Sequence, residues 1–356
     1  MEEEGRSQVI AQIEESRGHL HRIHRLLADL KGRNSPAESI EEDLFRVREG
    51  YHNFRLDSFS QPAPEINFQK NPVSHSLNLR FFSRTLQRTQ LVGHFLVKGQ
   101  EVPVHYSITG AIVLMRQNRS FKVWGSPALR YNVLLPFRYV EDKGVLDSIR
   151  NDSLIHLVDS EADRNEYTQM RISAVRKAHE ITRQLRGGLF SQWKEKEGKD
   201  LSQVMVADGM IEDLPNSDLT DNFIATSRTV YVPWQNSELV ESQLTIPAYR
   251  RGEVMKVTDT TESGPNNKYT WFTRMRMKSQ SGPEFGLLRT TIIADSEQDA
   301  LERANAFSSC LVAERLPVTY PADNWDKLIF PHKLCNDFLE SMIPTQTTVK
   351  SYFARM

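Results

Sequence analysis

The sequence predicts an α/β or α+β fold with one mixed sheet flanked by helices. Two observations indicate it. Short β-branched and aromatic runs stand both before and after one long helical stretch, and further helical stretches occupy the two ends of the chain. The 356 residues allow one large domain or two ordinary ones, and a hydrophobic content of 39% is enough for a sizeable core.

Composition excludes several functional classes. The 45 Lys and Arg balance 46 Asp and Glu, so no global positive field draws the chain to nucleic acid, although a local basic groove stays open. No apolar run approaches the ~20 residues of a membrane helix, and the polar start carries no signal-peptide core. Two cysteines, Cys310 and Cys335, form no disulfide framework, so we expect small buried hydrophobes in a cytoplasmic protein.

Residues 1–56 are expected to form an N-terminal helical segment. Apolar residues at intervals of mostly three, four or seven predict an amphipathic helix from Ser7 to about Lys31, and a second helix is expected from Ala37 to about Arg48. The apolar face of this helix is narrow, and such a face usually packs on another helix, either in its own domain or in a partner chain. A homodimer is therefore one expectation. Residues 57–89, with several prolines among polar residues, predict a linker or surface excursion.

The main domain is expected over residues 90–345, followed by a tail over 346–356. Its first strands should form an antiparallel meander, at Leu91–Val97, Val104–Met115, Phe121–Trp124 and Tyr131–Val140. A helix from Glu161 to about Glu197 precedes the apolar run Val204–Ala207. Later strand candidates are Phe223–Ala225, Thr229–Val232, Glu253–Val257, Thr270–Met277 and Leu287–Ala294. A helix capped by Ser296 and a last helix from about His332 to Ile343 complete the domain.

Asp208 is the most informative carboxylate. It ends the apolar run that should be a central strand, and Gly209 lets the backbone turn directly after it. Glu180 on the preceding helix, or Glu212 and Asp213 just beyond, are expected to share a cation with it. Carboxylates converging on Mg²⁺ or Mn²⁺ would organise phosphodiester hydrolysis, whereas an Asp-Gly pair is also an ordinary turn.

Two further groups of residues carry candidate chemistry. Tyr320-Pro321 precedes an apolar stretch, and His332 opens a helix where its ring could face a cleft, although capping and packing are commoner roles for such residues. Arg228 and the strand arginines could together hold a phosphate backbone beside aromatic residues. A solvated sheet face with cross-strand ion pairs is the competing interpretation. The strand arginines are Arg274, Arg276 and Arg289.

These motifs, in their order, resemble the NurA family of nucleases. Val204-Met-Val-Ala-Asp208-Gly resembles the family's Asp-Gly strand, and Phe223-Ile-Ala-Thr-Ser-Arg228 its lysine strand with Arg in place of Lys. Tyr269 to Arg274 and Gly286 to Arg289 resemble the paired strands that follow, and Tyr320-Pro321 with Leu328 to His332 resembles the closing motif. Arg176-Lys-Ala-His-Glu180 resembles the helix that carries the family's Glu, with Glu166 as the fallback.

The resemblance implies a ribonuclease H-like fold and a Mn²⁺- or Mg²⁺-dependent DNA nuclease that processes DNA ends with a HerA-type hexameric ATPase, in DNA repair or antiphage defence. Asp208, Glu180, Tyr320 and His332 would line the site, with Asp208, Glu180 and His332 as metal ligands. A homodimer is also implied.

The sequence departs from the family pattern at the first strand. No Asp-Gly occurs before Asp208, and Ile108-Thr109-Gly110 stands where a carboxylate is wanted, with Asp57 as the nearest substitute. The late Arg289 is followed by threonines instead of Glu, and the spacing from Tyr320 to His332 is stretched. Loss of the first carboxylate would weaken or abolish two-metal catalysis. The alternative is therefore a catalytically degenerate NurA-like subunit that binds DNA or the ATPase without cutting.

Overall fold

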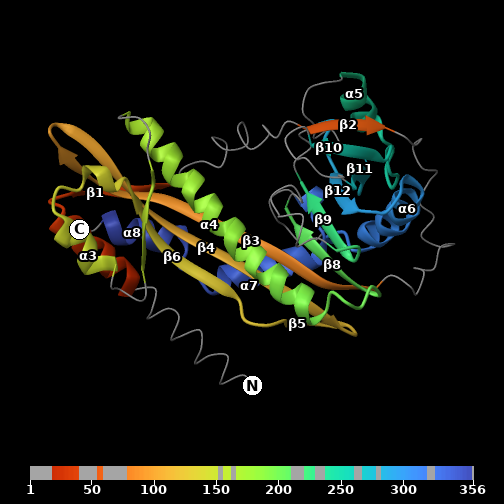
Figure 1. Ribbon diagram of the computed structural model, residues 1–356, viewed down its shortest axis with the longest axis horizontal. Coiled ribbons are helices and arrows are strands. Elements are labelled where there is room, and N and C mark those ends of the chain that lie inside the picture. The colour runs from red at the N-terminus through yellow and green to blue at the C-terminus, as the bar shows by residue number, and fades with distance from the viewer. Residues whose placement is uncertain are drawn as a thin grey trace.

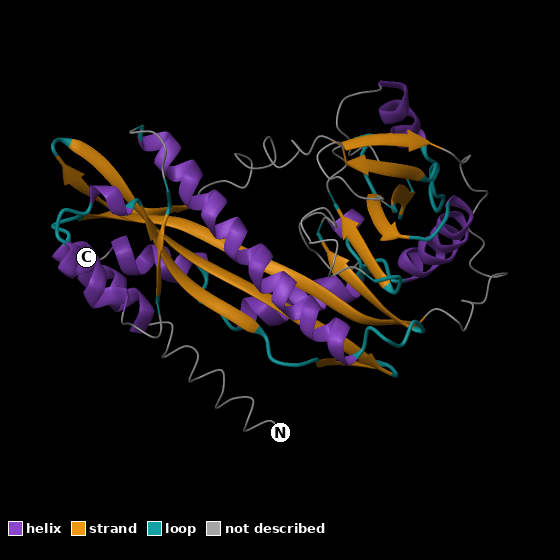
Figure 2. Cartoon of the chain, viewed as in Figure 1, coloured by secondary structure: helices purple, strands orange, loops and turns teal. Residues whose placement is uncertain are grey.

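A computed structural model describes residues 18–39, 54–58, 78–150, 155–161, 166–209, 220–228, 237–259, 267–277, 282–318 and 325–354. Its strands join into one sheet in the order β2-β10-β11-β12-β9-β8-β3-β4-β6-β7, with β1 added to β3 and β5 to β4. Figures 1 and 2 show an elongated molecule, with the β3–β4 hairpin extending to one end and β10, β11 and β12 gathered at the other. The predicted mixed sheet flanked by helices is confirmed.

The centre of the sheet has the strand order β9-β8-β3-β4-β6. β3 (Asn78–Val97), β4 (Gln100–Gln117) and β6 (Ala128–Leu135) form an antiparallel meander. After α4 (Tyr167–Lys196) the chain returns as β8 (Gln203–Asp208), parallel to β3, and then as β9 (Phe223–Ser227), parallel to β8. The carboxyl ends of β8 and β9 therefore lie side by side, which brings Asp208 next to the start of the segment after β9.

Two helices cover opposite faces of this central part. Phe81 packs against Trp193 of α4, with ring centroids 5.9 Å apart, whereas the next residue, Phe82, meets His332 of α7 (Phe330–Ser341) at 6.3 Å. Successive strand residues point to opposite faces, so α4 and α7 must lie on opposite sides of β3, as Figure 2 shows. Asp208 shares the α7 face with Val206, because the two differ by two positions on β8.

The remaining elements complete the two ends. An antiparallel extension of β12 (Leu287–Ile293), β11 (Lys268–Arg274), β10 (Met255–Asp259) and β2 (Phe54–Ser58) continues from β9. The other elements are α5 (Ser237–Thr245), α6 (Glu297–Ala313), α3 (Lys143–Arg150), α8 (Gln346–Ala354), β1 (Arg33–Ser39), β5 (Ser120–Val123), β7 (His156–Asp159) and the 3₁₀ turns Phe137–Tyr139 and Trp325–Lys327. No helix among the described residues is long and apolar enough to cross a lipid bilayer.

Several boundaries differ from the sequence predictions. The linker predicted over 57–89 contains the first part of β3, from residue 78, which is the central strand of the fold. The helix predicted from Ala37 begins instead as part of β1, which pairs with the far half of β3. These segments are polar, but pairing with neighbouring strands on the sheet makes them strands.

The described part of the N-terminal helix, residues 18–29, packs on this chain's own domain. Leu20, Ile23, Leu26 and Leu27 are at most 2% exposed and belong to the main core. The apolar face of this helix was expected to pack either on its own domain or on a partner chain, and these residues pack on their own domain. The first residues of the predicted helix lie outside the described part. Cys310 and Cys335 are free and buried, as predicted.

Candidate functional site

Asp208 lies at the carboxyl end of β8 and is surrounded by positive charge. Arg84 Nη1 on the adjacent strand β3 lies 3.3 Å from Asp208 Oδ2, and Arg228 Nη2 just after β9 lies 3.6 Å from the same oxygen. The side chains of Asp208 and Arg84 are 11% and 12% exposed, and that of Arg228 is 31% exposed. The carboxylate is thus nearly enclosed, with Arg228 at the rim. We call Asp208, Arg84, Arg186, Arg228 and His332 the Asp208 site.

The pairing of the strands explains why Arg84 meets Asp208. Ser83 of β3 lies opposite Ala207 of β8 in the parallel ladder, so the next residue on each strand shares the other face. This face is the one covered by α7. The long side chain of Arg84 therefore reaches the carboxylate from the neighbouring strand.

Arg186 reaches the site from α4 on the opposite face of the sheet. The Arg186 guanidinium lies beside Gly209, so closely that a side chain at position 209 would collide with it. Gly209 has a φ of +124°, which favours glycine, and its N–H donates to the Thr226 carbonyl oxygen at 2.7 Å. Gly209 therefore allows both the turn after Asp208 and the close approach of the Arg186 guanidinium.

The cations decide the charge state of Asp208. Burial raises the pKa of the Asp208 carboxyl, but Arg228, Arg84, His332 and Arg186 outweigh it and lower that pKa to about 2. Asp208 is therefore ionised at every physiological pH. Burial also lowers the pKa of the Arg84 guanidinium, and the charge of Arg228 lowers it further, while Asp208 raises it.

His332 is neutral in this setting. Burial lowers its pKa to about 4, although Asp208 opposes the shift. Its Nε2 lies 3.2 Å from the Val206 carbonyl oxygen. A carbonyl only accepts, so we assign the proton to Nε2, which leaves Nδ1 as the nitrogen with a lone pair. His332 lies in the first turn of α7, whose N-terminal end adds a partial positive charge to this side of the site.

The described residues do not fit a divalent metal centre. Three guanidinium groups and one carboxylate leave two positive charges in the Asp208 site, and its only ionised oxygen donors are those of Asp208, one of which faces Arg84 and Arg228. Among the residues that the structure describes, no three His, Cys, Asp or Glu side chains gather closely enough to hold a metal ion. Mg²⁺ and Mn²⁺ prefer several oxygen donors with net negative charge. Glu212 and Asp213 lie outside the described residues.

Glu180, expected as the second metal ligand, is engaged elsewhere. Its carboxylate is 36% exposed and lies 2.9 Å from Lys177 Nζ on the same helix. It precedes Arg186, the α4 residue at the site, by about 9 Å along the helix axis. The fallback Glu166 stands before the first turn of α4 and is farther still. Tyr320 lies outside the described residues, and Asp57 is on β2, at the edge of the sheet beyond β9, β12, β11 and β10.

The three strand arginines do not form an exposed patch, which corrects the prediction. Arg274 is fully buried and donates to the backbone carbonyls of Leu244, Ile246, Pro283 and Phe285. Arg276 is 6% exposed and stacks on the Trp325 ring at 4.3 Å. Arg289 is 3% exposed and its Nε donates to Thr270 Oγ1 at 3.1 Å. β11 and β12 are interior strands, so these side chains hold surrounding segments together and do not face solvent.

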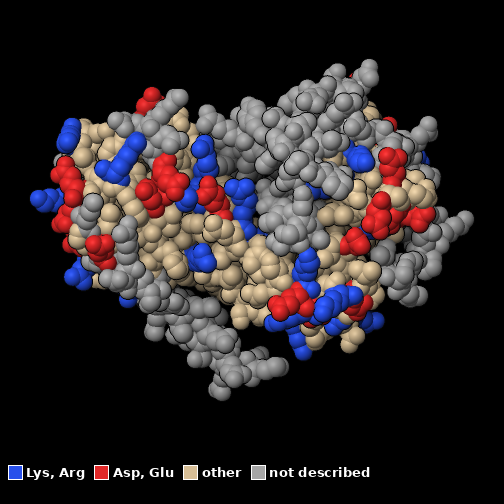
Figure 3. Space-filling view, viewed as in Figure 1, with Lys and Arg blue, Asp and Glu red and all other residues tan. Residues whose placement is uncertain are grey.

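Of the predicted residues, the structure brings Asp208, His332 and Arg228 together, although Arg228 was predicted beside the strand arginines. Arg84 and Arg186 were not predicted. A signal for Arg186 was present, because it falls in the buried stripe of α4 with Thr182 and Leu189, where a cation needs an acidic partner. No local signal marked Arg84. The face of the molecule seen in Figure 3 mixes Lys and Arg with Asp and Glu.

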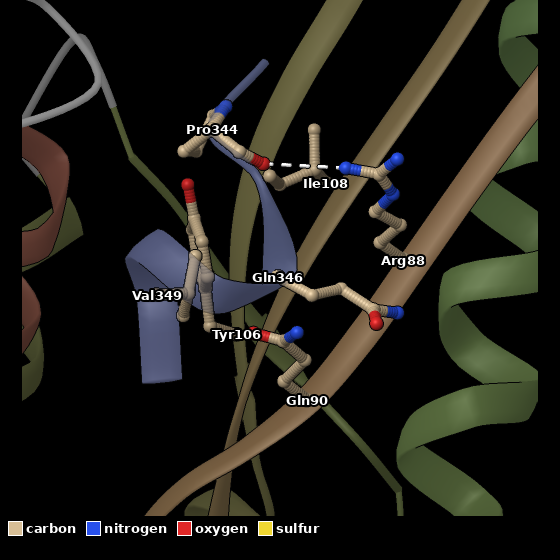
Figure 4. Close-up of a pocket in the computed structure, with 7 residues that line it drawn as sticks. All are labelled: Arg88, Gln90, Tyr106, Ile108, Pro344, Gln346 and Val349. Carbon is tan, nitrogen blue, oxygen red and sulfur yellow. Dashed lines mark hydrogen bonds between the residues drawn. The ribbon is translucent and has the colours of Figure 1, made fainter. Parts of the chain in front are cut away.

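A shallow depression lies between the β3–β4 hairpin and the C-terminal segment (Figure 4). Arg88 Nη1 donates to the Pro344 carbonyl oxygen at 3.3 Å across it, and Tyr106 and Val349 fill its floor. The side chains leave no space for a water-sized ligand. This depression is a packing contact, which leaves the Asp208 site as the candidate functional site of the described residues.

Comparison with known proteins gives a likeness to solved structures only. No protein-family model matches the chain, and no curated protein does. The crystal structure of the NurA nuclease from Sulfolobus solfataricus superposes with a TM-score of 0.36 and 8% sequence identity, over 85% of this chain and 93% of that one. This likeness concerns the path of the chain alone.

Proposed function

We propose that the chain binds the phosphate backbone of DNA at the Asp208 site, as a NurA-like subunit that handles DNA without metal-dependent cutting. The observation that supports this most is the ring of Arg84, Arg186 and Arg228 around a single carboxylate. Guanidinium groups match the oxygens of a phosphate, and the two excess positive charges favour an anion over a cation.

The order of the sequence motifs supports the rest of the proposal. In this account the partner is a HerA-like hexameric ATPase that delivers the DNA strand, and the working form is a homodimer. The near-zero net charge of the chain fits this division of labour, because a protein without a broad positive field gains little affinity for DNA from bulk electrostatics.

A second candidate function is metal-dependent DNA cleavage. One observation favours it: Asp208 stays ionised, with a pKa of about 2, at the carboxyl end of a parallel strand and beside His332. Mn²⁺ or Mg²⁺ would supply charge neutralisation at a scissile phosphate, and Asp208, Glu180 and His332 are the ligands that the sequence resemblance suggests. The positions of Arg84 and Glu180 speak against this function.

The test is DNA binding in the presence of EDTA, measured by fluorescence anisotropy with labelled single- and double-stranded DNA. We expect binding without metal, weakened several-fold by Arg228→Ala, with a salt slope smaller by about 0.7 to 0.9. Arg119→Ala, in an exposed turn, is the matched control and should leave both quantities unchanged. Absence of binding at low salt would refute the proposal.

A parallel incubation of both DNA substrates with Mn²⁺ separates the two functions. The proposal predicts no cleavage by the wild type, alone or with the cognate ATPase. Cleavage that disappears in Asp208→Ala and His332→Ala would establish the second candidate and overturn the first.

A further inference from the structure

Resting on the proposed function, we infer that Asp208 is a resident counter-anion: it occupies the arginines that a DNA phosphate needs and thereby limits how tightly the site binds. The inference assigns the acidic residue of a nuclease-like site a role opposite to catalysis. Asp208 would hold the free site together and weaken its complex with DNA.

The geometry shows that the carboxylate and a phosphate would compete for the same groups. Arg84 and Arg228 both direct a terminal nitrogen at the single oxygen Oδ2 of Asp208, at 3.3 and 3.6 Å. A phosphate oxygen that reached these two guanidiniums would have to share or replace that contact. A phosphate bound to these two arginines would also be repelled by Asp208, because the pKa of about 2 keeps that carboxylate negatively charged.

The site has capacity for an additional acceptor. Arg84 is nearly enclosed, yet its Nε and Nη1 atoms make no hydrogen bond within the described part of the protein, although Nη1 lies in the ion pair with Asp208. Buried donors without acceptors cost free energy, which a ligand with several acceptor oxygens recovers. A carboxylate offers two oxygens on one side of the site, whereas a phosphate offers acceptors in several directions.

The access route is through Arg228. Its side chain is 31% exposed, more than that of Arg84, the other arginine paired with Asp208, and it follows β9 directly. A phosphate therefore meets Arg228 first and Arg84 second. The N-terminal turn of α7 contributes a further fixed positive dipole from the same face.

The decisive variant is Asp208→Asn, which removes the charge and keeps the shape. Anisotropy with labelled single-stranded DNA in EDTA should show binding tighter by about tenfold, the size expected for one unit charge close to a partly buried phosphate. The salt slope should steepen by about 0.7, because a released guanidinium contacts phosphate. Glu314→Gln is the matched control: Glu314 also pairs with an arginine, Arg116, at 2.7 Å and is 20% exposed, and its removal should leave DNA affinity unchanged.

Asp208→Asn is also expected to lower the melting temperature, because it leaves buried arginines without their carboxylate. Asp208→Ser serves as a second variant, and inorganic phosphate as a second probe: phosphate should raise the melting temperature of either variant more than that of the wild type. If the wild type binds DNA and both variants bind it equally well or more weakly, this inference is overturned while the proposed function stands. Failure of every form to bind DNA would overturn the proposed function as well.

Discussion

Arg84 Nη1 lies 3.3 Å from Asp208 Oδ2, across adjacent parallel strands at the centre of the sheet. In a site that holds metal ions, a cation between acidic side chains would balance their charge. Here a guanidinium from the chain itself balances the carboxylate, and Arg228 and Arg186 add two more positive charges. The site is therefore organised for an anion, and the proposals above follow from this one pairing.

Replacing Arg274 should affect stability and not DNA binding. Four backbone carbonyls, from two separate segments, accept hydrogen bonds from its buried guanidinium. Arg274→Ala leaves those buried carbonyls unpaired, and we expect the free energy of unfolding to fall by about 3 kcal/mol in urea titrations. Arg119→Ala should change it by less than about 0.5 kcal/mol. A marked loss of DNA affinity in the folded Arg274→Ala protein would show that this arginine does contact DNA.

Acidification should destabilise the protein through two buried histidines, His105 and His332, and the half-buried His179. Burial lowers the pKa of His332 and of His179 to about 4 and that of His105 to about 3, whereas unfolded histidine titrates near 6.5. Between these values the unfolded chain binds more protons than the folded one, so stability is present above about pH 6.5 and is lost as the pH falls toward 4.

His332→Gln isolates the contribution of the histidine in the Asp208 site. The free energy of unfolding, from urea titrations at pH 7 and pH 4.5, should drop by about 2 kcal/mol less in this variant than in the wild type. Asp208 contributes almost nothing between pH 7 and pH 4.5, because its stabilisation is lost only as the pH falls through its unfolded pKa of about 3.9 toward its folded pKa of about 2. Equal drops in the two proteins would mean that His332 is already protonated or exposed in the folded state.

Two glycines near Arg186 should respond oppositely to alanine. Gly209→Ala places a Cβ at a φ of +124° and against the Arg186 guanidinium, so we expect a loss of about 2 kcal/mol and weaker DNA binding. Gly187 lies inside α4 with open space around it, and Gly187→Ala should stabilise by about 0.5 to 1 kcal/mol. Thermal melting of both variants checks the pair, and a neutral Gly209→Ala would contradict the described approach of Arg186.

The sequence predicted the parts of the fold that carry strong local patterns. The apolar run before Asp208, the long helix before it and the helix that starts near His332 are present as β8, α4 and α7. Ser296 caps α6 as predicted, accepting from the Asp299 N–H at 3.1 Å. In each case hydrophobic periodicity or capping chemistry is contained within one segment, so the neighbours in space are not needed to recognise it.

The rest depended on pairing between distant segments. The first half of β3 is polar around Arg84 and carries little strand signal, but β4 and β8 complete its ladder on both sides. Arg274 and Arg276 alternate in the sequence as on an exposed sheet face, yet β11 lies inside the sheet, and Arg274 donates to backbone carbonyls, among them that of Leu244 in α5. The register between β3 and β8 determines which residue of β3 lies beside Asp208, and this register cannot be read from a single sequence.

The most direct test asks whether Arg84 occupies the place of a metal ion beside Asp208. Isothermal titration calorimetry measures the binding of Mn²⁺ to the wild type and to Arg84→Asp. The substitution sets a second carboxylate beside Asp208 in place of the guanidinium. The account predicts no saturable Mn²⁺ binding by the wild type and binding of the ion by Arg84→Asp, lost again when Asp208→Asn is added. Saturable Mn²⁺ binding by the wild type that Asp208→Asn abolishes would contradict it.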